Sequence, residues 1–496
     1  MSVSAKLVYQ CPISLYQLVN GISKSKGSHF FVKMYQRLDF SAFYQIFDPR
    51  TNEIALDADI SMVLNFQHLL SEHLVFFDVM FNDKLYNFSM KFNSKTELEA
   101  FVDYYVLLKI EESLGHQAGR DERDELERFK EYCSLDESSA VSNKCVEHEY
   151  ITQGSPKEGM NTILRTSPST GKVYIVRRSN RNSDLGMFSY DYECKFQMAV
   201  QNMRTPKKET VSISDALLNS SQGRMYFLDE SAQSSIHDFD VVRGQIIKTY
   251  EAVDKDEEEL SLSTLMPEKP HIESSTFLAF NTRDTMRFDP RVGRIVDRSA
   301  YKGVNMFTSG KTTTNGKLVM GSANGILRLY SGPCKQRATV NFQANTGSDP
   351  IIGVDVSPDE QWLLAACPFY LSIVNIYDSH AKKTAFDTPM RGNRPPLRRL
   401  VIKPEHQQKI AQHFNGKMPP FSNAKFDLNG SKISGIIACI GTGMVRWEFE
   451  SIQQSKQPVY TISLIGSETV IDNDPFNDSS HILFMTENQL TVLTYE

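Results

Sequence analysis

One strand ending recurs along roughly the last 350 residues of this chain, and it constrains the fold more than any other feature. An apolar strand ends in an aromatic residue that is followed by Asp, Ser or Glu. Successive endings are 51, 49, 42, 47 and 70 residues apart, and a seventh candidate strand, LTVLTYE, closes the chain. The endings are Phe188-Ser189, Phe239-Asp240, Phe288-Asp289, Tyr330-Ser331, Tyr377-Asp378 and Trp447-Glu448.

These spacings predict a β-propeller like those of WD-repeat proteins, because one blade of four short strands takes about 40 to 50 residues. The 70-residue interval contains GNRPPLRR and PEHQQKIAQHF, so we interpret it as one blade with an insertion near residues 390–420. A second, acidic insertion is expected near residues 253–270. We therefore predict seven blades over residues 147–496, with six blades as the alternative.

A Gly-Lys-Thr at residues 310–312 raises the alternative of a phosphate-binding loop. Such a loop needs a first glycine five residues before the Gly-Lys pair, and it must lead into a helix. Asn305 occupies the position of that glycine, and the sequence after Thr312 continues into the strand-like KLVMGSANGILRLYS. The segment is therefore predicted to be part of a blade.

Residues 1–115 carry a different pattern of short aromatic-rich strands, among them HFFVKMY, SAFYQIF, LVFFDVMF and KLYNFSMKF. They are followed by a helical pattern that begins with a capping box, Ser94 and Glu97. Its apolar stripe comprises Leu98, Phe101, Val102, Tyr105 and Leu108. Antiparallel strands followed by one amphipathic helix are typical of a pleckstrin-homology-like barrel.

A charged segment separates the two predicted domains. Residues 1–115, 116–149 and 150–496 have net charges of −3, −5 and +2. The acidic excess per residue is highest in the middle segment, so residues 116–146 are predicted to form a charged, partly helical linker. The chain as a whole has no basic excess, and nucleic acid is not an expected partner.

Two groups of cations are candidate binding residues. Lys24, Lys26, Lys33 and Arg37 would hold an inositol phosphate on the first domain, and the alternative is that they are ordinary solvated residues. Arg391, Arg394, Arg398 and Arg399 surround two prolines and would bind acidic or phosphorylated peptides, since guanidinium groups make bidentate contacts with such anions. The alternative for this second group is a solubilising loop.

An ordered set of strand motifs over residues 170–450 resembles the vacuolar import and degradation protein twenty-seven family. The motifs are GRMYFLDESAQSSIHDFDVVRGQII, MRFDPRVGRIV, LVMGSANGILRLYS, SPDEQWLLAAC and VIKPEH. The resemblance implies a cytoplasmic protein with a pleckstrin-homology-like region ahead of a WD-like propeller. The family name implies a role in delivering cytosolic cargo to the vacuole or lysosome. The resemblance supplies no catalytic residues, and the linker lacks the long acidic tract of the family.

The sequence shows no motif of a hydrolase, a zinc protease, a dinucleotide-binding site or a calcium loop. Its seven cysteines have no metal-ligand spacing and are expected to be free thiols. We therefore predict no catalytic residue, no metal and no cofactor, and a cytoplasmic scaffold that binds partner proteins through propeller loops. The alternative is a phosphoinositide-binding adaptor peripheral on endomembranes, and a propeller enzyme with a central-channel site is the least favoured class.

Overall fold

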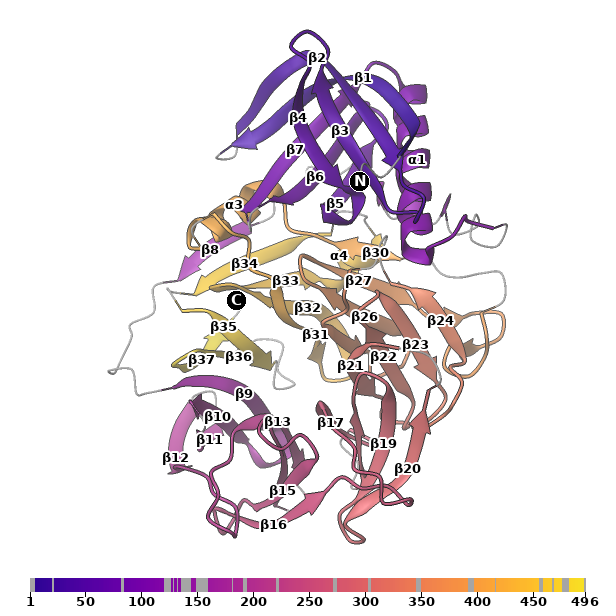
Figure 1. Ribbon diagram of the computed structural model, residues 1–496. Helices are drawn as coiled ribbons and strands as arrows, with labels where there is room; N and C mark the ends of the chain where they lie inside the picture. The colour runs from indigo at the N-terminus through magenta and orange to yellow at the C-terminus, as the bar shows by residue number, and fades with distance from the viewer. Residues whose placement is uncertain are drawn as a thin grey trace.

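A computed structural model describes residues 5–19, 22–81, 84–119, 126–127, 129–131, 133–134, 144–148, 159–180, 182–190, 194–219, 223–270, 274–301, 305–344, 349–390, 397–414, 416–454, 458–465, 468–474 and 481–494. The chain is mainly β, with an N-terminal sheet beside a seven-bladed propeller (Figure 1). The predicted fold class is thereby confirmed, and the six-bladed alternative is wrong.

The aromatic-rich N-terminal strands form one antiparallel sheet in the order β4-β3-β2-β1-β7-β6-β5. The sheet leaves β4 and β5 as its two edges, and the short helix η1 (Ile60–Met62) joins them. Its strands are β1 (Lys6–Val19), β2 (Ile22–Gln36), β3 (Ala42–Asp48), β4 (Glu53–Asp59), β5 (Val63–Leu69), β6 (Leu74–Phe81) and β7 (Lys84–Phe92).

Helix α1 (Lys95–Leu114) covers this sheet and begins as the capping box predicts. Ser94 accepts a hydrogen bond from the Glu97 N–H at 3.2 Å, and Gly115 ends the helix with a φ of 70°. All five residues of the predicted apolar stripe are buried. The pleckstrin-homology-like assignment of this sheet and helix stays a prediction.

The first four blades are antiparallel sheets of four strands each. In each blade the first strand in the chain lies innermost and contacts the first strand of the next blade. Their strands are β9 (Met160–Ser167), β10 (Lys172–Ser179), β11 (Asn182–Tyr190) and β12 (Cys194–Val200); β13 (Ile213–Asn219), β14 (Arg224–Asp229), β15 (Ser235–Asp240) and β16 (Gln245–Glu251); β17 (Thr264–Pro267), β18 (Phe277–Phe280), β19 (Asp284–Asp289) and β20 (Arg294–Ala300); β21 (Phe307–Thr312), β22 (Leu318–Ser322), β23 (Ile326–Tyr330) and β24 (Val340–Gln343). The short helix η2 (Pro168–Thr170) joins β9 to β10.

The last three blades depart from this plan. Between β27 and β30, blade 5 carries an inserted segment with a small hairpin of β28 (Tyr377–Asp378) and β29 (Lys383–Thr384), which lies ahead of the predicted bounds of residues 390–420. Blade 7 has three strands within the described residues. Helix α3 (Pro404–Gln412) follows blade 5, and α4 (Phe449–Gln454) lies within blade 6. The remaining strands are β25 (Gly353–Val356), β26 (Trp362–Cys367), β27 (Tyr370–Asn375) and β30 (Arg398–Leu400); β31 (Phe421–Asn429), β32 (Lys432–Ile440), β33 (Gly443–Glu448) and β34 (Tyr460–Ile465); β35 (Val470–Asp474), β36 (His481–Thr486) and β37 (Leu490–Thr494).

Blade 6 gains a fifth strand from the segment ahead of the propeller. Strand β8 (Lys144–His148) pairs in parallel with β34, with Lys144 opposite Thr461 and His148 opposite Ile465. Backbone groups at the outer edge of β34 therefore find partners in a distant part of the sequence.

The ring closes where blade 7 meets blade 1. The Asn161 backbone N–H donates to the Glu487 carbonyl at 2.8 Å, and the buried Asn161 side chain donates to the Thr486 carbonyl at 3.0 Å. On the inner strands, the Thr166 hydroxyl donates to the Asp474 carboxylate at 2.8 Å. Side chains and loop backbone thus close the ring, since β9 and β35 belong to separate sheets.

The N-terminal sheet is docked on blades 5 and 6 (Figure 1). The buried Arg399 of β30 donates to the Phe66 carbonyl of β5 at 3.0 Å, and Asn87 of β7 donates to Gln407 of α3 at 3.3 Å. Leu85 packs against the apolar cluster that blades 5 and 6 share. The two parts of the chain are therefore joined by a buried contact.

Six cysteines of the described chain are free thiols, and burial raises the pKa of several. The pKa rises to about 11 for Cys133 and to about 12 for Cys194, Cys334 and Cys439, because burial disfavours the thiolate.

This burial predicts a loss of stability at alkaline pH. Unfolding returns each thiol to a pKa near its ordinary value of 9.0, so the stabilisation is present below about pH 9. It is lost as pH rises from about 9 towards about 12, because the unfolded chain then releases protons that the folded chain keeps. Urea unfolding at about pH 8 and about pH 10 checks this, and replacing Cys194 and Cys439 by Ala should flatten the difference. Equal unfolding free energies at the two pH values would contradict it.

Candidate functional site

The inner strands that surround the propeller axis carry ion pairs between neighbouring blades. Arg165 of β9 contacts Asp215 of β13 at 2.8 Å. The second carboxylate oxygen of Asp215 accepts the Leu265 N–H of β17 at 2.7 Å. Burial raises the pKa of Asp215, and the Arg165 guanidinium opposes that rise. This single carboxylate therefore links three consecutive blades.

The same arrangement recurs on the other side of the ring. Lys311 of β21 lies 3.3 Å from Asp355 of β25, and Asp355 also accepts the Phe426 N–H of β31 at 2.9 Å. Lys425 of β31 lies 3.4 Å from Asp472 of β35. Burial lowers the pKa of Lys425, but the Asp472 and Asp474 carboxylates hold it above its usual value. Inner-strand charges are thus paired across blade boundaries.

A catalytic site in the central channel would require carboxylates or histidines that converge on the propeller axis. The inner-strand charges described above are instead paired with neighbouring blades. Within the described residues, no three His, Cys, Asp or Glu side chains come together as metal ligands would. Lys311 of the Gly-Lys-Thr lies in strand β21, and Thr312 donates to the Pro267 carbonyl at 2.7 Å. The strand interpretation of that motif is confirmed.

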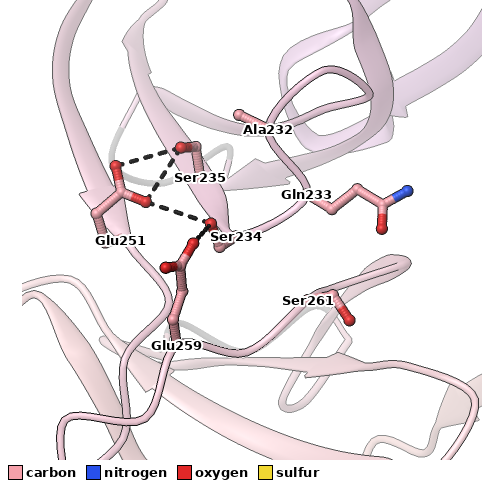
Figure 2. A pocket seen from close by; sticks show the side chains of 7 residues that line it. All are labelled: Ala232, Gln233, Ser234, Ser235, Glu251, Glu259 and Ser261. Atoms are coloured by element: carbon pink, nitrogen blue, oxygen red, sulfur yellow. Dashed lines mark hydrogen bonds between the residues drawn. The ribbon is translucent and has the colours of Figure 1, made fainter.

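A polar pocket of about 570 Å³ lies between blades 2 and 3 (Figure 2). Ser235 donates to Glu251 at 3.2 Å, and Ser234 donates to Glu251 at 3.4 Å and more closely to Glu259. None of the described residues that line the pocket is cationic. Two carboxylates beside hydroxyl groups accept hydrogen bonds, so this pocket suits a donor group such as a lysine, an arginine or a polyol. Its lining residues are Ala232, Gln233, Ser234, Ser235, Glu251, Glu259 and Ser261.

The acidic insertion predicted near residues 253–270 forms part of this pocket. Arg298 of β20 contacts Asp254 at 3.0 Å and Glu258 at 2.7 Å, which fixes the segment to blade 3. Leu260 and Leu262 are buried in the core between blades 2 and 3. Residues 253–263 of the predicted insertion are therefore an ordered connection between β16 and β17, whereas residues 264–267 are β17 itself, the inner strand of blade 3.

The four cations proposed to bind an inositol phosphate do not converge. Lys24 and Lys26 are exposed near the β1–β2 hairpin, whereas Lys33 lies 4.2 Å from the centre of the Phe47 ring. Arg37 is 3.0 Å from Asp59. Arg37 follows the end of β2 and is 13 positions from Lys24, a path of about 40 Å along the strand. One headgroup therefore cannot contact all four.

The four arginines of the predicted peptide-binding loop are also separated. Arg391 and Arg394 lie outside the described residues. Arg398 is partly buried and donates to the Ile452 carbonyl of α4. Arg399 is buried, with its guanidinium 4.2 Å from the centre of the Tyr370 ring. Arg398 and Arg399 are bonded within the protein because β30 pairs with β27 at the docked face of blade 5.

The aspartates that connect neighbouring blades were not predicted from the sequence, although the sequence contains a pattern that indicates them. Asp215 is the third residue of β13 and Asp355 is the third residue of β25, and each accepts a backbone N–H from the next blade. An aspartate at the same place in two inner strands is a repeat cue. It would have identified these residues as blade connectors.

One protein family and two curated yeast proteins are similar to this chain in sequence. Residues 160–495 match the model of the VID27 C-terminal WD40-like domain. The Schizosaccharomyces pombe protein called vacuolar import and degradation protein 27 is 24% identical over 464 residues, covering 82% of this chain and 55% of the relative. The Saccharomyces cerevisiae protein of the same name is 22% identical over 358 residues, covering 66% and 44%. This chain spans about half the length of these relatives.

Solved propellers are similar at lower identity. The β-propeller domain of Myceliophteria thermophila Cps50 (Swd1) is 10% identical, with a TM-score of 0.48 and coverage of 69% of this chain and 99% of that one. The C-terminal WD40 domain of Sif2 is 9% identical, with a TM-score of 0.45 and coverage of 68% and 81%. Because the family model matches well over half of the sequence, this chain belongs to the VID27 family.

Proposed function

We propose that this chain is a non-enzymatic scaffold that binds partner proteins through the rim and loops of its propeller. The proposal rests on where the propeller places its charged and its apolar side chains. Inner-strand charges such as Arg165, Lys311 and Lys425 bond to adjacent blades, while apolar side chains such as Phe196 and Val242 remain exposed outside. A rigid ring with variable outer surfaces is suited to holding other proteins.

The names of the two yeast relatives support a more specific role. Both are called vacuolar import and degradation protein 27. We propose that the bound proteins include cytosolic cargo on its way to the vacuole or lysosome, and that the chain acts in the cytoplasm. Within the described residues, no helix has the length and apolar character needed to cross a membrane.

Quantitative affinity purification from cytosol with the tagged full-length chain tests the scaffold proposal. We expect a reproducible set of proteins that a tagged, unrelated seven-bladed propeller does not recover. Recovery of the same proteins with both baits, or of none above background, would contradict the proposal.

A second candidate function, a membrane adaptor, is favoured by the exposure of Lys24 and Lys26 on β2. The double variant Lys24→Glu, Lys26→Glu should lose sedimentation with phosphoinositide liposomes, because the headgroup attracts cations. Lys335→Glu with Arg337→Glu is the matched control, since both residues are exposed on the propeller. Unchanged sedimentation of the first variant would remove this candidate.

A further inference from the structure

Within the part of the chain that the structure describes, the outer edge of blade 1 is the least protected strand edge of blades 1 to 6. Edge strands usually carry charge, are short or are covered, because unpaired backbone groups attract other strands. The five residues of β12 from Phe196 to Val200 contain no charged side chain, and those from Phe196 to Ala199 are exposed. By contrast, β16 and β20 carry charges, β24 and β30 have four and three residues, and β34 pairs with β8.

Apolar side chains lie on both sides of this edge. Phe196 is 62% exposed and its ring contacts Phe188 at 5.6 Å, on the side that faces blade 7. Met198 is 41% exposed and lies on the side of blade 2, where a Cβ at Gly244 would be 3.6 Å from its terminal carbon. A bulge at Gln197 separates the two, so they point to opposite faces of the strand.

The turn that contains Gly244 extends the apolar surface and supplies a charge. Val242 is 86% exposed. Arg243 is also exposed, and its nearest carboxylate, Asp240, is 3.8 Å away and already accepts the backbone N–H groups of Val242 and Arg243. At the other end of the edge, Lys195 is exposed and has no ion pair within the described residues. The apolar surface is therefore bordered by two cations.

This propeller already accepts an additional strand at one outer edge. Strand β8 comes from outside the four-stranded blade and pairs with β34 along five residues. Main-chain pairing with an outer strand is thus compatible with the ring, and β12 offers the same backbone groups on either side of its bulge.

We propose that the outer edge of β12 is a docking site for an extended segment of a partner protein, in which apolar side chains are flanked by acidic residues. The apolar side chains contact Phe196, Met198 and Val242, and the acidic residues meet Lys195 and Arg243. The inference rests on the proposed scaffold function and names the surface and the chemistry of its partner.

Fluorescence anisotropy with the full-length chain tests this site. The probe is the labelled peptide Glu-Val-Ile-Thr-Val-Ile-Glu, which presents apolar side chains on both faces of a strand, and its charge-matched opposite has lysine at both ends. We expect the acidic peptide to bind at least about tenfold more tightly than the basic one, with affinity that falls as salt rises. Phe196→Glu and Met198→Glu should each weaken it by at least about tenfold. Val292→Glu, at a 56% exposed valine in the corresponding turn of blade 3, is the control and should leave binding unchanged.

Four outcomes would overturn the proposal. Two concern the peptides: no measurable binding of the acidic peptide, or equal binding of the acidic and basic peptides. The third is an equal effect of Phe196→Glu and Val292→Glu on binding. The fourth is protection of the β12 amides from hydrogen exchange in the protein alone, which would show that the chain itself or a second copy covers the edge. Affinity purification with Phe196→Glu separates this site from the scaffold function. If every partner is retained, the site fails and the scaffold stands, whereas recovery of no partner by the unmodified chain refutes the scaffold.

Discussion

A fragment that begins at Met160, the start of the matched domain, is expected to be much less stable than the full-length chain. It loses β8, so the edge of β34 is left unpaired, and it loses the N-terminal sheet that covers blades 5 and 6. It also leaves Arg399 without the Phe66 carbonyl. We expect a loss of roughly 4 kcal/mol, which lowers the melting temperature by about 5 to 10 °C and promotes aggregation.

Thermal unfolding and size-exclusion chromatography measure this effect. A second fragment that begins at Lys144 restores β8 but not the sheet, so it separates the two contributions. We expect it to melt between the shorter fragment and the full-length chain. A fragment from Met160 that is monomeric and melts within about 2 °C of the full-length chain would show that the docked surface contributes little.

Arg399→Ala should produce the largest effect of any single substitution at the contact between the sheet and the propeller. The substitution removes the donor to the Phe66 carbonyl and the cation above the Tyr370 ring, and it leaves a cavity. The same Tyr370 donates a 2.6 Å hydrogen bond to Asp349, so the substitution also uncovers a ring that holds this carboxylate. We expect a loss of about 2 to 4 kcal/mol in urea unfolding.

Two variants make this result interpretable. Arg399→Met keeps apolar packing against Tyr370 but offers no donor, so its loss should be smaller, about 1 to 2 kcal/mol. Arg283→Ala removes an exposed arginine of the propeller and should change stability by no more than about 0.5 kcal/mol. If Arg399→Ala matched Arg283→Ala, the buried guanidinium would not stabilise the contact.

The blade count could be predicted because the third strand of a blade ends in the same way for a physical reason. Phe239 and Phe288 are fully buried, and the aspartates that follow them accept backbone N–H groups in the next turn. A buried aromatic ring followed by a turn-forming carboxylate gives a recognisable residue pair in the sequence. In blade 5 this pair, Tyr377-Asp378, lies in the two-residue β28 beyond the third strand, which explains why the Tyr377 ring is exposed.

The features missed in the sequence depend on contacts between distant residues. A Pro- and Arg-rich segment favours a protruding loop, yet Arg399 is buried because β5 of another domain lies against it. Lys24 and Arg37 are close in sequence but far apart in space, since a strand extends by about 3.3 Å per residue. Likewise, the pairing of β8 with β34 depends on a partner more than 300 residues away, which local patterns do not record.

The closure of the ring at Asn161 and Thr486 has a consequence for synthesis of the chain. These residues are 325 positions apart, so blade 1 leaves the ribosome long before its partner in blade 7 exists. At about 5 to 20 residues per second, the delay is roughly 15 to 65 s. During that interval the nascent chain exposes the inner edge of its first blade, and β8 has no β34 to pair with. We therefore expect the nascent chain to need protection by chaperones from the synthesis of blade 1 until blade 7 has been completed.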